Sequence, residues 1–244
     1  MDNLKTFFGK QKIDQNKKTN LVQDVFSEVS SKYDLMNDLM SFGAHRLWKK
    51  RFVEIMNIQN NDKIIDIGSG TGDLIKIIDK LNKNVNLIST DYNFKMLEYN
   101  KKKYFSIKDL QWINCNAEEL PFKNNYFDKY ILAFCLRNIT LIEKALEEAL
   151  RILKPGGYFY CLEFSTPQSP LINLFYDYYK KNIIPKIGDR VANNKNAYKY
   201  LEESIENFPN QELFISALNQ IGFKKTKYIN LFNGIVSIHM GCKI

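Results

Sequence analysis

The stretch Lys63-Ile-Ile-Asp-Ile-Gly-Ser-Gly-Thr-Gly-Asp73 decides the expected fold class. It begins with an apolar run, continues with glycines at 68, 70 and 72, and leads into apolar residues at helical spacing over 74–81. Glycine lets the backbone turn sharply and lets a ligand approach where a Cβ would collide. The stretch therefore predicts a buried strand, a tight turn and a helix start, the unit that holds a nucleotide-like ligand in doubly wound folds.

Acidic residues distinguish this turn from a dinucleotide-binding turn. The dinucleotide pattern G-x-G-x-x-G ends in glycine, whereas the sixth position here is Asp73. A pyrophosphate brings negative charge to the helix N-terminus, where an acid would repel it. Asp66 and Asp73 instead favour a cationic ligand such as S-adenosylmethionine (SAM), which carries a sulfonium and an ammonium group. We expect Asp66, Gly68, Gly70 and Gly72 to bind this cofactor, the alternative being a glycine turn without a ligand.

The composition indicates one globular domain. The chain has 244 residues, of which 45% are hydrophobic and 14% aromatic, enough for a substantial core. The net charge is +8, but only five of the 35 basic residues are arginines, and the lysines are scattered along the chain. We interpret them as solvated faces with a weak attraction to anionic lipid surfaces. The sequence has no concentrated Arg/Lys stripe with interleaved aromatics, so we expect no nucleic-acid partner.

The cysteines and the lack of long apolar runs predict the cellular location. The cysteines are Cys115, Cys135, Cys161 and Cys242. None has C-x-x-C spacing, and three lie in or beside strand-like runs, which favours buried free thiols in a reducing compartment over bridges or a metal site. The first ten residues lack a signal-peptide core, and no apolar run approaches the roughly 18 residues of a membrane span. We expect a cytoplasmic protein without a metal, whose membrane contact, if any, is peripheral and at the inner face.

Strand-like and helix-like segments alternate after the glycine turn. The expected strands are 85–91, 110–115, 127–134 and 158–164, and the expected helices are 95–103, 141–152 and about 210–221. Such alternation with short connections forms one parallel sheet with right-handed crossovers. Asn233-Gly234 joins segments 225–232 and 235–243 and is a strong signal for a two-residue hairpin. We predict an α/β fold with a doubly wound, mostly parallel, Rossmann-like sheet and a terminal antiparallel hairpin, as expected in SAM-dependent methyltransferases.

The remaining segments divide a single domain over 1–244 into parts. Residues 1–20 are polar and are expected to form a flexible arm, and 21–56 carry apolar residues at helical spacing and form an N-terminal helical cap. Residues 165–208 are an aromatic-rich helical insertion, bounded by prolines, before the last helix. We expect the cap and the insertion to cover a substrate cleft, although most of these aromatics would serve equally well as ordinary core.

Polar residues at two further strand ends complete the expected cofactor pocket. Asp91 lies 19 residues past Gly72, about where an acid at the end of the second strand binds a ribose diol. The alternative role of Asp91 is that of an exposed acid at a strand end. Asn116, at the end of the third strand, has a side chain that suits the edge of an adenine.

Several stretches resemble the ubiquinone/menaquinone biosynthesis C-methyltransferase family over nearly the whole chain. They are Ser31-Lys-Tyr-Asp-Leu-Met-Asn-Asp-Leu-Met-Ser-Phe-Gly-Ala-His-Arg-Leu-Trp48, Gly70-Thr-Gly-Asp73, Asn116-Ala-Glu118, Leu136-Arg-Asn138, Leu153-Lys-Pro-Gly-Gly157, Leu162-Glu-Phe-Ser165, Pro185-Lys-Ile-Gly188, Tyr198-Lys-Tyr-Leu-Glu-Glu-Ser204 and Asn230-Leu-Phe-Asn-Gly-Ile-Val236. The glycine turn alone would indicate only a methyltransferase. The stretches at 31–48, 136–138 and 185–204 make the match specific to the quinone family.

The resemblance implies methyl transfer from SAM to a ring carbon of a polyprenylated benzoquinol (the 2-methoxy-6-polyprenyl-1,4-benzoquinol type), a demethylmenaquinol, or both. It also implies that Thr71, Asp91, Asn116 and Ala117 contact SAM. It leaves open a place in a complex of quinone-biosynthesis enzymes and a homodimer.

Three departures from the family pattern lie near the expected cofactor pocket. Ala133 stands where the family often has Ser, so any contact of Ala133 with the cofactor must be apolar or through the backbone. Cys135 replaces the usual Gly before Leu-Arg-Asn, and Gly68-Ser69 replaces the usual Ala-Gly. None of these changes removes a group that the chemistry needs.

Arg137 is the candidate catalytic residue. An aromatic carbon is a weak nucleophile until a hydroxyl on its ring loses its proton, and a phenol has a pKa near 10. A guanidinium is a poor proton acceptor, so we expect Arg137 to stabilise the developing phenolate. The family resemblance points to the same arginine, and its alternative role is to cap a helix or to form a surface ion pair.

Tyr33, Asp34, Asn37 and Glu163 are the candidates for binding the quinol head. Glu163 ends the fifth strand and could accept a quinol proton or hold a loop on the SAM side. Two other functions stay open. One is a SAM-dependent methyltransferase that acts on another small molecule or on RNA. The other is a catalytically silent SAM-binding scaffold of a quinone-synthesis complex.

Overall fold

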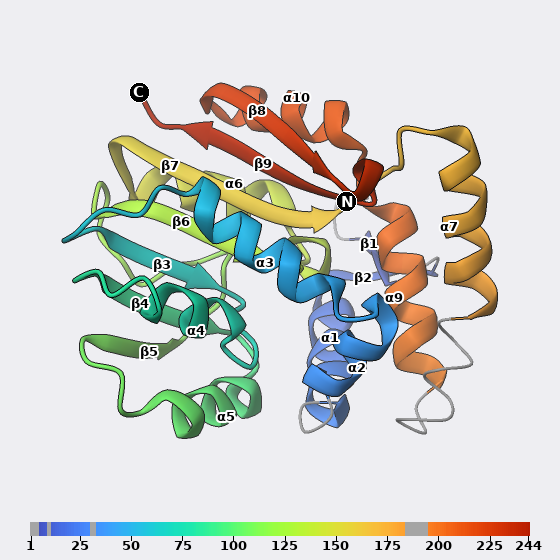
Figure 1. The fold of residues 1–244 in the computed structure, drawn as a ribbon, viewed down its shortest axis with the longest axis horizontal. Coiled ribbons are helices and arrows are strands. Elements are labelled where there is room, and N and C mark those ends of the chain that lie inside the picture. The colour runs from blue at the N-terminus through green and yellow to red at the C-terminus, as the bar shows by residue number, and fades with distance from the viewer. Residues whose placement is uncertain (1–4, 9–10, 30–32, 184–194) are drawn as a thin grey trace.

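The computed structural model describes residues 5–8, 11–29, 33–183 and 195–244, and its centre is a seven-stranded sheet (Figure 1). The strands are β3 (Lys63–Ile67), β4 (Asn86–Asp91), β5 (Leu110–Asn114), β6 (Phe127–Ala133), β7 (Leu153–Phe164), β8 (Lys224–Leu231) and β9 (Val236–Cys242). Their order is β5-β4-β3-β6-β7-β9-β8. β3 to β7 pair in parallel, and β9 pairs antiparallel with both β7 and β8. The predicted fold class is confirmed.

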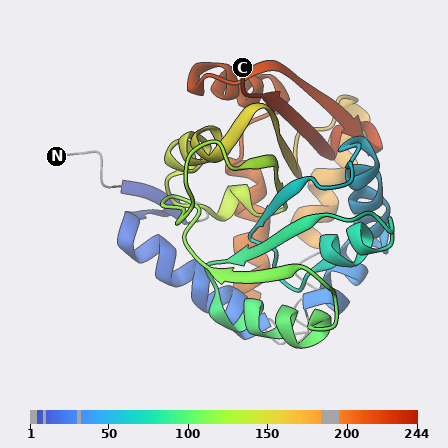
Figure 2. The same ribbon diagram turned by 90° about the vertical axis from the view of Figure 1, so that its left-hand side faces the viewer.

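Helices cover both faces of the twisted sheet (Figure 2). One face carries α3 (Ala44–Ile55), α4 (Asp73–Asp79) and α5 (Phe94–Tyr104), and the other carries α6 (Ile142–Ile152) and α10 (Gln211–Ile221). Successive side chains of a strand point to opposite faces, so Ile64 packs with α3 and α4 while Ile65 packs with α6 and α10. The three isoleucines of β3, Ile64, Ile65 and Ile67, are consistent with this burial on both sides.

The C-terminal hairpin is present, but its turn differs from the predicted one. Residues 232–235 separate β8 from β9, and they contain a short 3-10 turn, η4 (Phe232–Gly234). Asn233 and Gly234 adopt positive φ values of 59° and 92°, as a two-residue turn would require, but Phe232 does so as well, at 48°. The prediction of a two-residue turn is therefore wrong, because the turn that joins β8 to β9 comprises residues 232–235. The Asn233 carbonyl accepts a hydrogen bond from the Gln168 N–H at 2.8 Å. The longer turn is therefore bonded to the segment that follows β7.

Four more helices gather where the carboxyl ends of the parallel strands point (Figure 1). They are α1 (Gln15–Val29), α2 (Tyr33–Ser41), α7 (Pro170–Asn182) and α9 (Lys195–Asn207). Ligands of open α/β sheets bind outside the carboxyl ends of the strands. The N-terminal helices and the insertion therefore cover the edge of the sheet where a site is expected.

The helical cap begins earlier in the chain than its apolar pattern predicts. β1 (Lys5–Phe8) and β2 (Gln11–Asp14) pair antiparallel, and α1 starts at Gln15, within the segment expected to be a flexible arm. Lys18 Nζ donates to the Ile139 carbonyl at 3.0 Å, and the Thr19 and Thr140 hydroxyls lie 2.9 Å apart. The first turns of α1 are thus fixed by polar contacts, which hydrophobic periodicity does not detect.

Candidate active site

The glycine turn between β3 and α4 is left-handed at each of its three glycines. The φ angle is +61° at Gly68, +54° at Gly70 and +84° at Gly72. A Cβ at Gly68 would lie 2.1 Å from the Cys135 sulfur, and one at Gly72 would lie 2.5 Å from the Tyr104 ring. A Cβ at Gly70 would meet nothing within 4 Å. Gly68 and Gly72 are therefore needed for close packing, whereas Gly70 borders open space.

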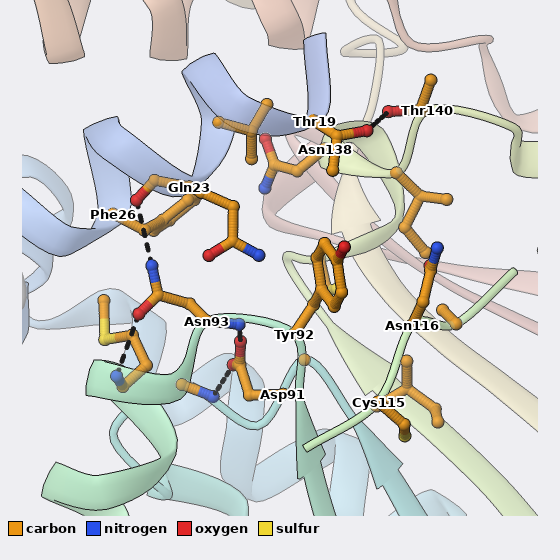
Figure 3. A pocket seen from close by; sticks show the side chains of 18 of the residues that line it. Thr19, Gln23, Phe26, Asp91, Tyr92, Asn93, Cys115, Asn116, Asn138 and Thr140 are labelled. Atoms are coloured by element: carbon orange, nitrogen blue, oxygen red, sulfur yellow. Dashed lines mark hydrogen bonds between the residues drawn. The ribbon is translucent and has the colours of Figure 1, made fainter. Parts of the chain in front are cut away.

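Asp91, at the end of β4, is fixed by two backbone N–H groups (Figure 3). Gly70 donates to its Oδ2 and Asn93 to its Oδ1, each at 2.8 Å. Burial raises the pKa of the Asp91 carboxyl to about 6, although the two N–H donors oppose this effect. The acid predicted to meet a ribose diol is thus held rigidly against the glycine turn.

A first cavity of about 130 Å³ opens at the carboxyl ends of β3, β4 and β6 (Figure 3). Among the predicted cofactor-binding residues, those that line it are Gly68, Gly70, Asp91, Asn116, Ala117 and Ala133. Residues that the sequence reasoning missed also line it, chiefly Thr19, Val22, Gln23 and Phe26 of α1 and Asn93. The apolar pattern of Val22, Val25 and Phe26 predicted a helix. It did not predict that one face of this helix would cover the cofactor pocket.

α1 is held across this cavity by the Asn93 side chain. The Asn93 Nδ2 atom donates to the Gln23 carbonyl at 3.0 Å and to the Ser27 hydroxyl at 2.9 Å, while its Oδ1 atom accepts the Met96 N–H and caps α5. Asn93 is 5% exposed. One side chain therefore joins α1 to the β4–α5 loop, which begins directly after Asp91.

The other predicted residues of the turn lie outside the set that lines the first cavity. Asp66 is 1% exposed, its Oδ2 has no hydrogen-bond partner in the described part of the chain, and burial followed by the charge of Asp91 raises its pKa well above the ordinary value. Thr71 donates from its hydroxyl to Asp34 Oδ1 at 2.5 Å. Asp73 pairs with Lys49 Nζ at 2.5 Å, so the acid that distinguishes this turn from a dinucleotide turn already has a cationic partner within the protein.

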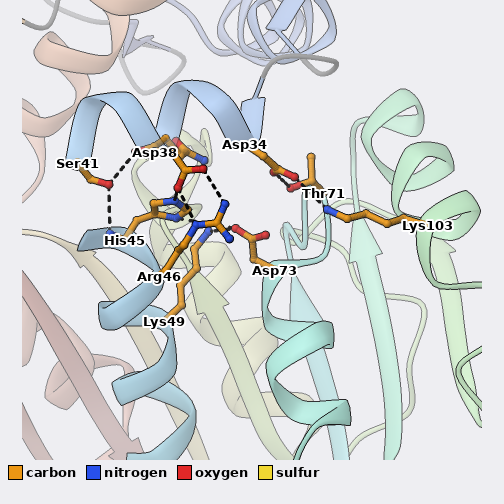
Figure 4. Close-up of polar contacts among 10 residues, drawn as sticks. Asp34, Asp38, Ser41, His45, Arg46, Lys49, Thr71, Asp73 and Lys103 are labelled. Carbon is orange, nitrogen blue, oxygen red and sulfur yellow. Dashed lines mark hydrogen bonds and ion pairs between the residues drawn. The ribbon is translucent and has the colours of Figure 1, made fainter. Parts of the chain in front are cut away.

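Side chains of α2 and α3 fasten these helices to the glycine turn and to α5 (Figure 4). Asp34 of α2 accepts from Thr71 at 2.5 Å and pairs with Lys103 of α5 at 2.9 Å. Lys49 of α3 is largely buried where it meets Asp73. The helical cap is therefore bonded directly to the glycine turn that shapes the first cavity.

The corner between α2 and α3 has its own polar support (Figure 4). Asp38 accepts two hydrogen bonds from Arg46, at 2.7 and 2.6 Å, and the ring of His45 lies 2.8 Å from the same carboxylate. These contacts, of which the Arg46 hydrogen bonds count most, hold the pKa of Asp38 well below its usual range. They fix the left-handed corner at Phe42 and Gly43.

A second, larger cavity of about 810 Å³ lies under α2, α3, α7 and α9. It is lined mainly by apolar and aromatic side chains, among them Met40, Phe42, Trp48, Phe164, Phe175, Tyr176, Tyr179 and Phe232. Asn37 and Arg137 also line it. The side chain of Tyr33 lies outside the described residues. Asn37 is therefore the predicted quinol-binding residue placed at this cavity.

Arg137 and Glu163 form a buried ion pair beside the second cavity. Arg137 lies in η3 (Leu136–Asn138), directly after β6, and its Nη1 atom donates to Glu163 Oε1 and to the Phe134 carbonyl, each at 2.7 Å. The side chains are 5% and 0% exposed. Burial raises the pKa of Glu163, while the adjacent guanidinium acts in the opposite direction. Glu163 therefore orients Arg137 rather than facing the cavity itself.

The chain matches one protein family and several solved folds. The model of the ubiE/COQ5 methyltransferase family matches residues 11–243. A ubiquinone/menaquinone biosynthesis C-methyltransferase UbiE from Rickettsia prowazekii is 48% identical, and one from Rickettsia bellii is 47% identical. Each alignment covers 98% of this chain and 99% of the relative.

Two of the structural neighbours are methyltransferases of low sequence identity. A SAM-dependent methyltransferase from Thermotoga maritima has a TM-score of 0.65 at 19% identity, covering 91% of this chain and 99% of its own. One from Aquifex aeolicus has a TM-score of 0.61 at 14% identity, covering 96% and 100%. These neighbours support the fold, and the sequence matches support the family. The chain belongs to the ubiE/COQ5 methyltransferase family.

Proposed function

We propose that this SAM-dependent methyltransferase transfers a methyl group to a ring carbon of a polyprenylated benzoquinol, a demethylmenaquinol, or both. The observation that carries the proposal is the pair of adjoining cavities. One has polar groups fixed at strand ends, and the other is large, apolar and bordered by Arg137. The names of the relatives, which refer to ubiquinone and menaquinone biosynthesis, support the choice of acceptor.

The residues around the first cavity fit SAM. Gly70 leaves room where a Cβ would project, Asp91 offers a fixed carboxylate to a ribose diol, and Asn116 and Ala117 supply an amide group and an apolar wall. SAM supplies an electrophilic methyl group on a positively charged sulfur. The Asp91 carboxylate, which lines this cavity and is ionised above about pH 6, makes the region favourable for a cation.

Arg137 has the environment of a group that stabilises a phenolate. Its guanidinium stays charged at any physiological pH, and it lies in a buried site where an electrostatic contact is stronger than in water. Glu163 and the Phe134 carbonyl fix its orientation before a substrate enters. Methyl transfer would form a bond between the ring carbon and the methyl group and leave the S–C electron pair on the sulfur, giving SAH. The ring carbon would then lose its proton to solvent water, which restores aromaticity.

Label transfer from methyl-tritiated SAM to a short-chain benzoquinol tests this proposal. Wild-type protein is expected to label the quinol ring. Arg137→Ala should lower turnover by about 100-fold or more, the size found when a fixed electrostatic donor is removed, while the Kd for S-adenosylhomocysteine (SAH) stays within about threefold. Arg51→Ala, which removes an exposed cation paired with Glu54, is the matched control and should leave both unchanged. An equal loss of turnover and SAH binding in Arg137→Ala would indicate a structural role.

We also propose that the second cavity takes the prenyl tail and that its rim docks on the membrane surface. Large apolar side chains that are more than half exposed cluster on α7 and at the α2–α3 corner: Phe42, Leu47, Leu171, Leu174, Phe175 and Tyr178. Four of them also line the cavity. None of the described helices is long and apolar enough to cross a bilayer. We propose a peripheral contact, made by these apolar side chains with the lipid surface.

Flotation with anionic liposomes at low salt tests the docking. Wild-type protein should float, and Phe42→Ser with Phe175→Ser should abolish most of the binding, because both side chains are exposed at the rim. Leu213→Ser, on α10, removes an equally exposed apolar side chain away from the cavity and should have no effect. Wild-type protein that stays unbound would exclude the docking.

A further inference from the structure

Phe134 is the one described residue that lines both cavities. It follows β6 directly and precedes the turn that carries Arg137. A methyl group that moves from a donor in the first cavity to an acceptor in the second must pass where the cavities adjoin. We propose that the Phe134 ring forms this passage and positions the acceptor ring for methyl transfer. The inference rests on the proposed function for the identity of the acceptor.

The backbone of Phe134 is in a conformation that a bulky residue rarely adopts. Its φ angle is +58°, in the left-handed region, where the Cβ of an L-residue is crowded. Strain of this kind persists where the surroundings enforce it, and it clusters at functional sites. The Phe134 N–H donates to the Leu162 carbonyl at 2.8 Å, and its carbonyl accepts from Arg137 Nη1 at 2.7 Å. Both ends of the residue are thus held in place.

The left-handed backbone directs the ring into an aromatic cluster. Ring centroids lie 4.8 Å from Phe164 of β7 and 6.1 Å from Trp48 of α3, and Phe134 is 9% exposed. An aromatic carbon attacks a methyl group through the face of its ring, so the plane of the acceptor ring must be roughly perpendicular to the line along which the methyl group moves. A rigid aromatic wall at the junction of the cavities provides that constraint.

The contact between Phe134 and Arg137 links this constraint to the candidate catalytic group. The guanidinium that would bind the phenolate is anchored on the carbonyl of the residue whose ring borders the passage. The oxygen of the acceptor and the plane of its ring are therefore fixed relative to one short segment, 134–137. A shift of that segment would misplace both, which explains why a strained conformation is retained there.

The first test separates positioning from cofactor binding. Phe134→Leu keeps an apolar side chain but removes the flat wall. It is expected to lower kcat by about 100-fold, the cost of a misplacement near 1 Å, with the Kd for SAH within about threefold of wild type. Unchanged kcat would overturn the proposal, and so would a parallel loss of SAH binding, which would make Phe134 a simple support of the first cavity. Failure of wild-type protein to methylate the quinol would instead overturn the proposed function.

The second test measures the strain without any substrate. Phe134→Gly and Phe134→Ala both remove the ring, but only glycine relieves the left-handed backbone. The glycine variant should therefore melt about 2–4 °C above the alanine variant, the reverse of the usual order. Ala133→Gly, at the neighbouring position, which is not left-handed, should lower the melting temperature. An alanine variant that melts above the glycine variant would show that position 134 is unstrained and overturn this part of the inference.

Discussion

The two cavities are built by different means. The first is about 130 Å³ and is shaped by strand ends and the glycine turn, where backbone N–H groups fix the orientation of Asp91. The second is about 810 Å³ and is shaped by helices from two distant parts of the chain, with apolar walls. A polar ligand is recognised by a few rigid hydrogen-bonding groups, whereas an apolar one is recognised by shape and by the area removed from water.

The two cavities are nevertheless mechanically connected. Asp34 and Lys49, which belong to the helices over the second cavity, contact Thr71 and Asp73 of the glycine turn. The Lys49–Asp73 ion pair is largely shielded from water, whereas Asp34, which also pairs with Lys103, is 31% exposed. A substitution in the glycine turn should therefore also displace α2 and α3, which cover the second cavity. A substitution in the apolar wall of the second cavity should leave the first cavity intact.

The largest expected effect is the removal of the Asp91 carboxylate. Asp91→Ala leaves the Gly70 and Asn93 N–H groups without an acceptor and deletes the proposed ribose contact, together about 2–3 kcal/mol. The Kd for SAH, measured by calorimetry, should rise about 100-fold, with little change in the quinol KM. Asp79→Ala, which removes an exposed acid from α4, should bind SAH normally. Normal SAH binding by Asp91→Ala would exclude Asp91 from the cofactor site.

The second effect tests a pair of departures from the family pattern. Gly68→Ala places a methyl group 2.1 Å from the Cys135 sulfur and also strains a left-handed position, so it should cost about 2–4 kcal/mol of unfolding free energy. Adding Cys135→Gly removes the clash and restores the family's usual pair. Urea unfolding of the four proteins in this cycle should show recovery to within about 1–2 kcal/mol of wild type. Additive losses would mean that the two positions are independent.

The sequence predicted the first cavity far better than the second. Asp91 and Asn116 could be placed because they lie where apolar strand patterns end, and parallel strands end at one edge of the sheet. Ala133 was assigned from the family resemblance instead. The glycine spacing likewise predicted the tight turn, which the structure shows to be left-handed at all three glycines. Local patterns thus sufficed wherever a residue's role is set by its place at the end of a strand.

The predictions that the structure corrects concern residues whose partners are distant in the chain. Asp73 was assigned to a cationic ligand, but Lys49, 24 residues earlier, neutralises it. α1 lies over the first cavity although its polar early turns indicated a flexible arm, since Lys18 is held by the Ile139 carbonyl. The contacts at the second cavity join helices that are distant in the chain. The Tyr179 hydroxyl and the Met40 carbonyl, for example, belong to residues 139 positions apart, and no local pattern encodes such a contact.

A pH dependence should distinguish the first cavity from the second. Burial raises the pKa of Asp91 to about 6 from 3.8, so the folded protein binds more protons than the unfolded chain between these pH values. Stability linked to this group therefore falls as the pH rises from about 4 to about 6, by about 1.4 kcal/mol per unit at most. The hydroxyls of a ribose diol donate hydrogen bonds to the ionised Asp91 carboxylate. The affinity for SAH should therefore fall by up to about tenfold for each pH unit below pH 6. Asp91→Asn should flatten both profiles, and an unchanged SAH profile would show that another group titrates.

The smallest effect concerns a hydroxyl at the second cavity. The Tyr176 hydroxyl is buried and has no hydrogen-bond partner among the described residues, and burial raises its pKa. Tyr176 lines the same cavity as Arg137, and the positive charge of Arg137 acts to lower the pKa of the Tyr176 phenol, against the larger effect of burial. An unpaired buried hydroxyl costs stability in the free protein, but it becomes useful when a ligand oxygen meets it.

Tyr176→Phe should therefore change stability and affinity in opposite directions. Without the unpaired hydroxyl, the free protein should gain about 1 kcal/mol of unfolding free energy, while the quinol KM should rise about fivefold because one hydrogen bond is lost. The Kd for SAH should stay constant, since Tyr176 is not among the residues of the first cavity. Tyr99→Phe, which alters an exposed tyrosine of α5 that is in the lining of neither cavity, should change none of these quantities. If Tyr176→Phe lowers stability with KM unchanged, the hydroxyl is bonded within the protein and the quinol head is held by other groups, such as Asn37 and Arg137.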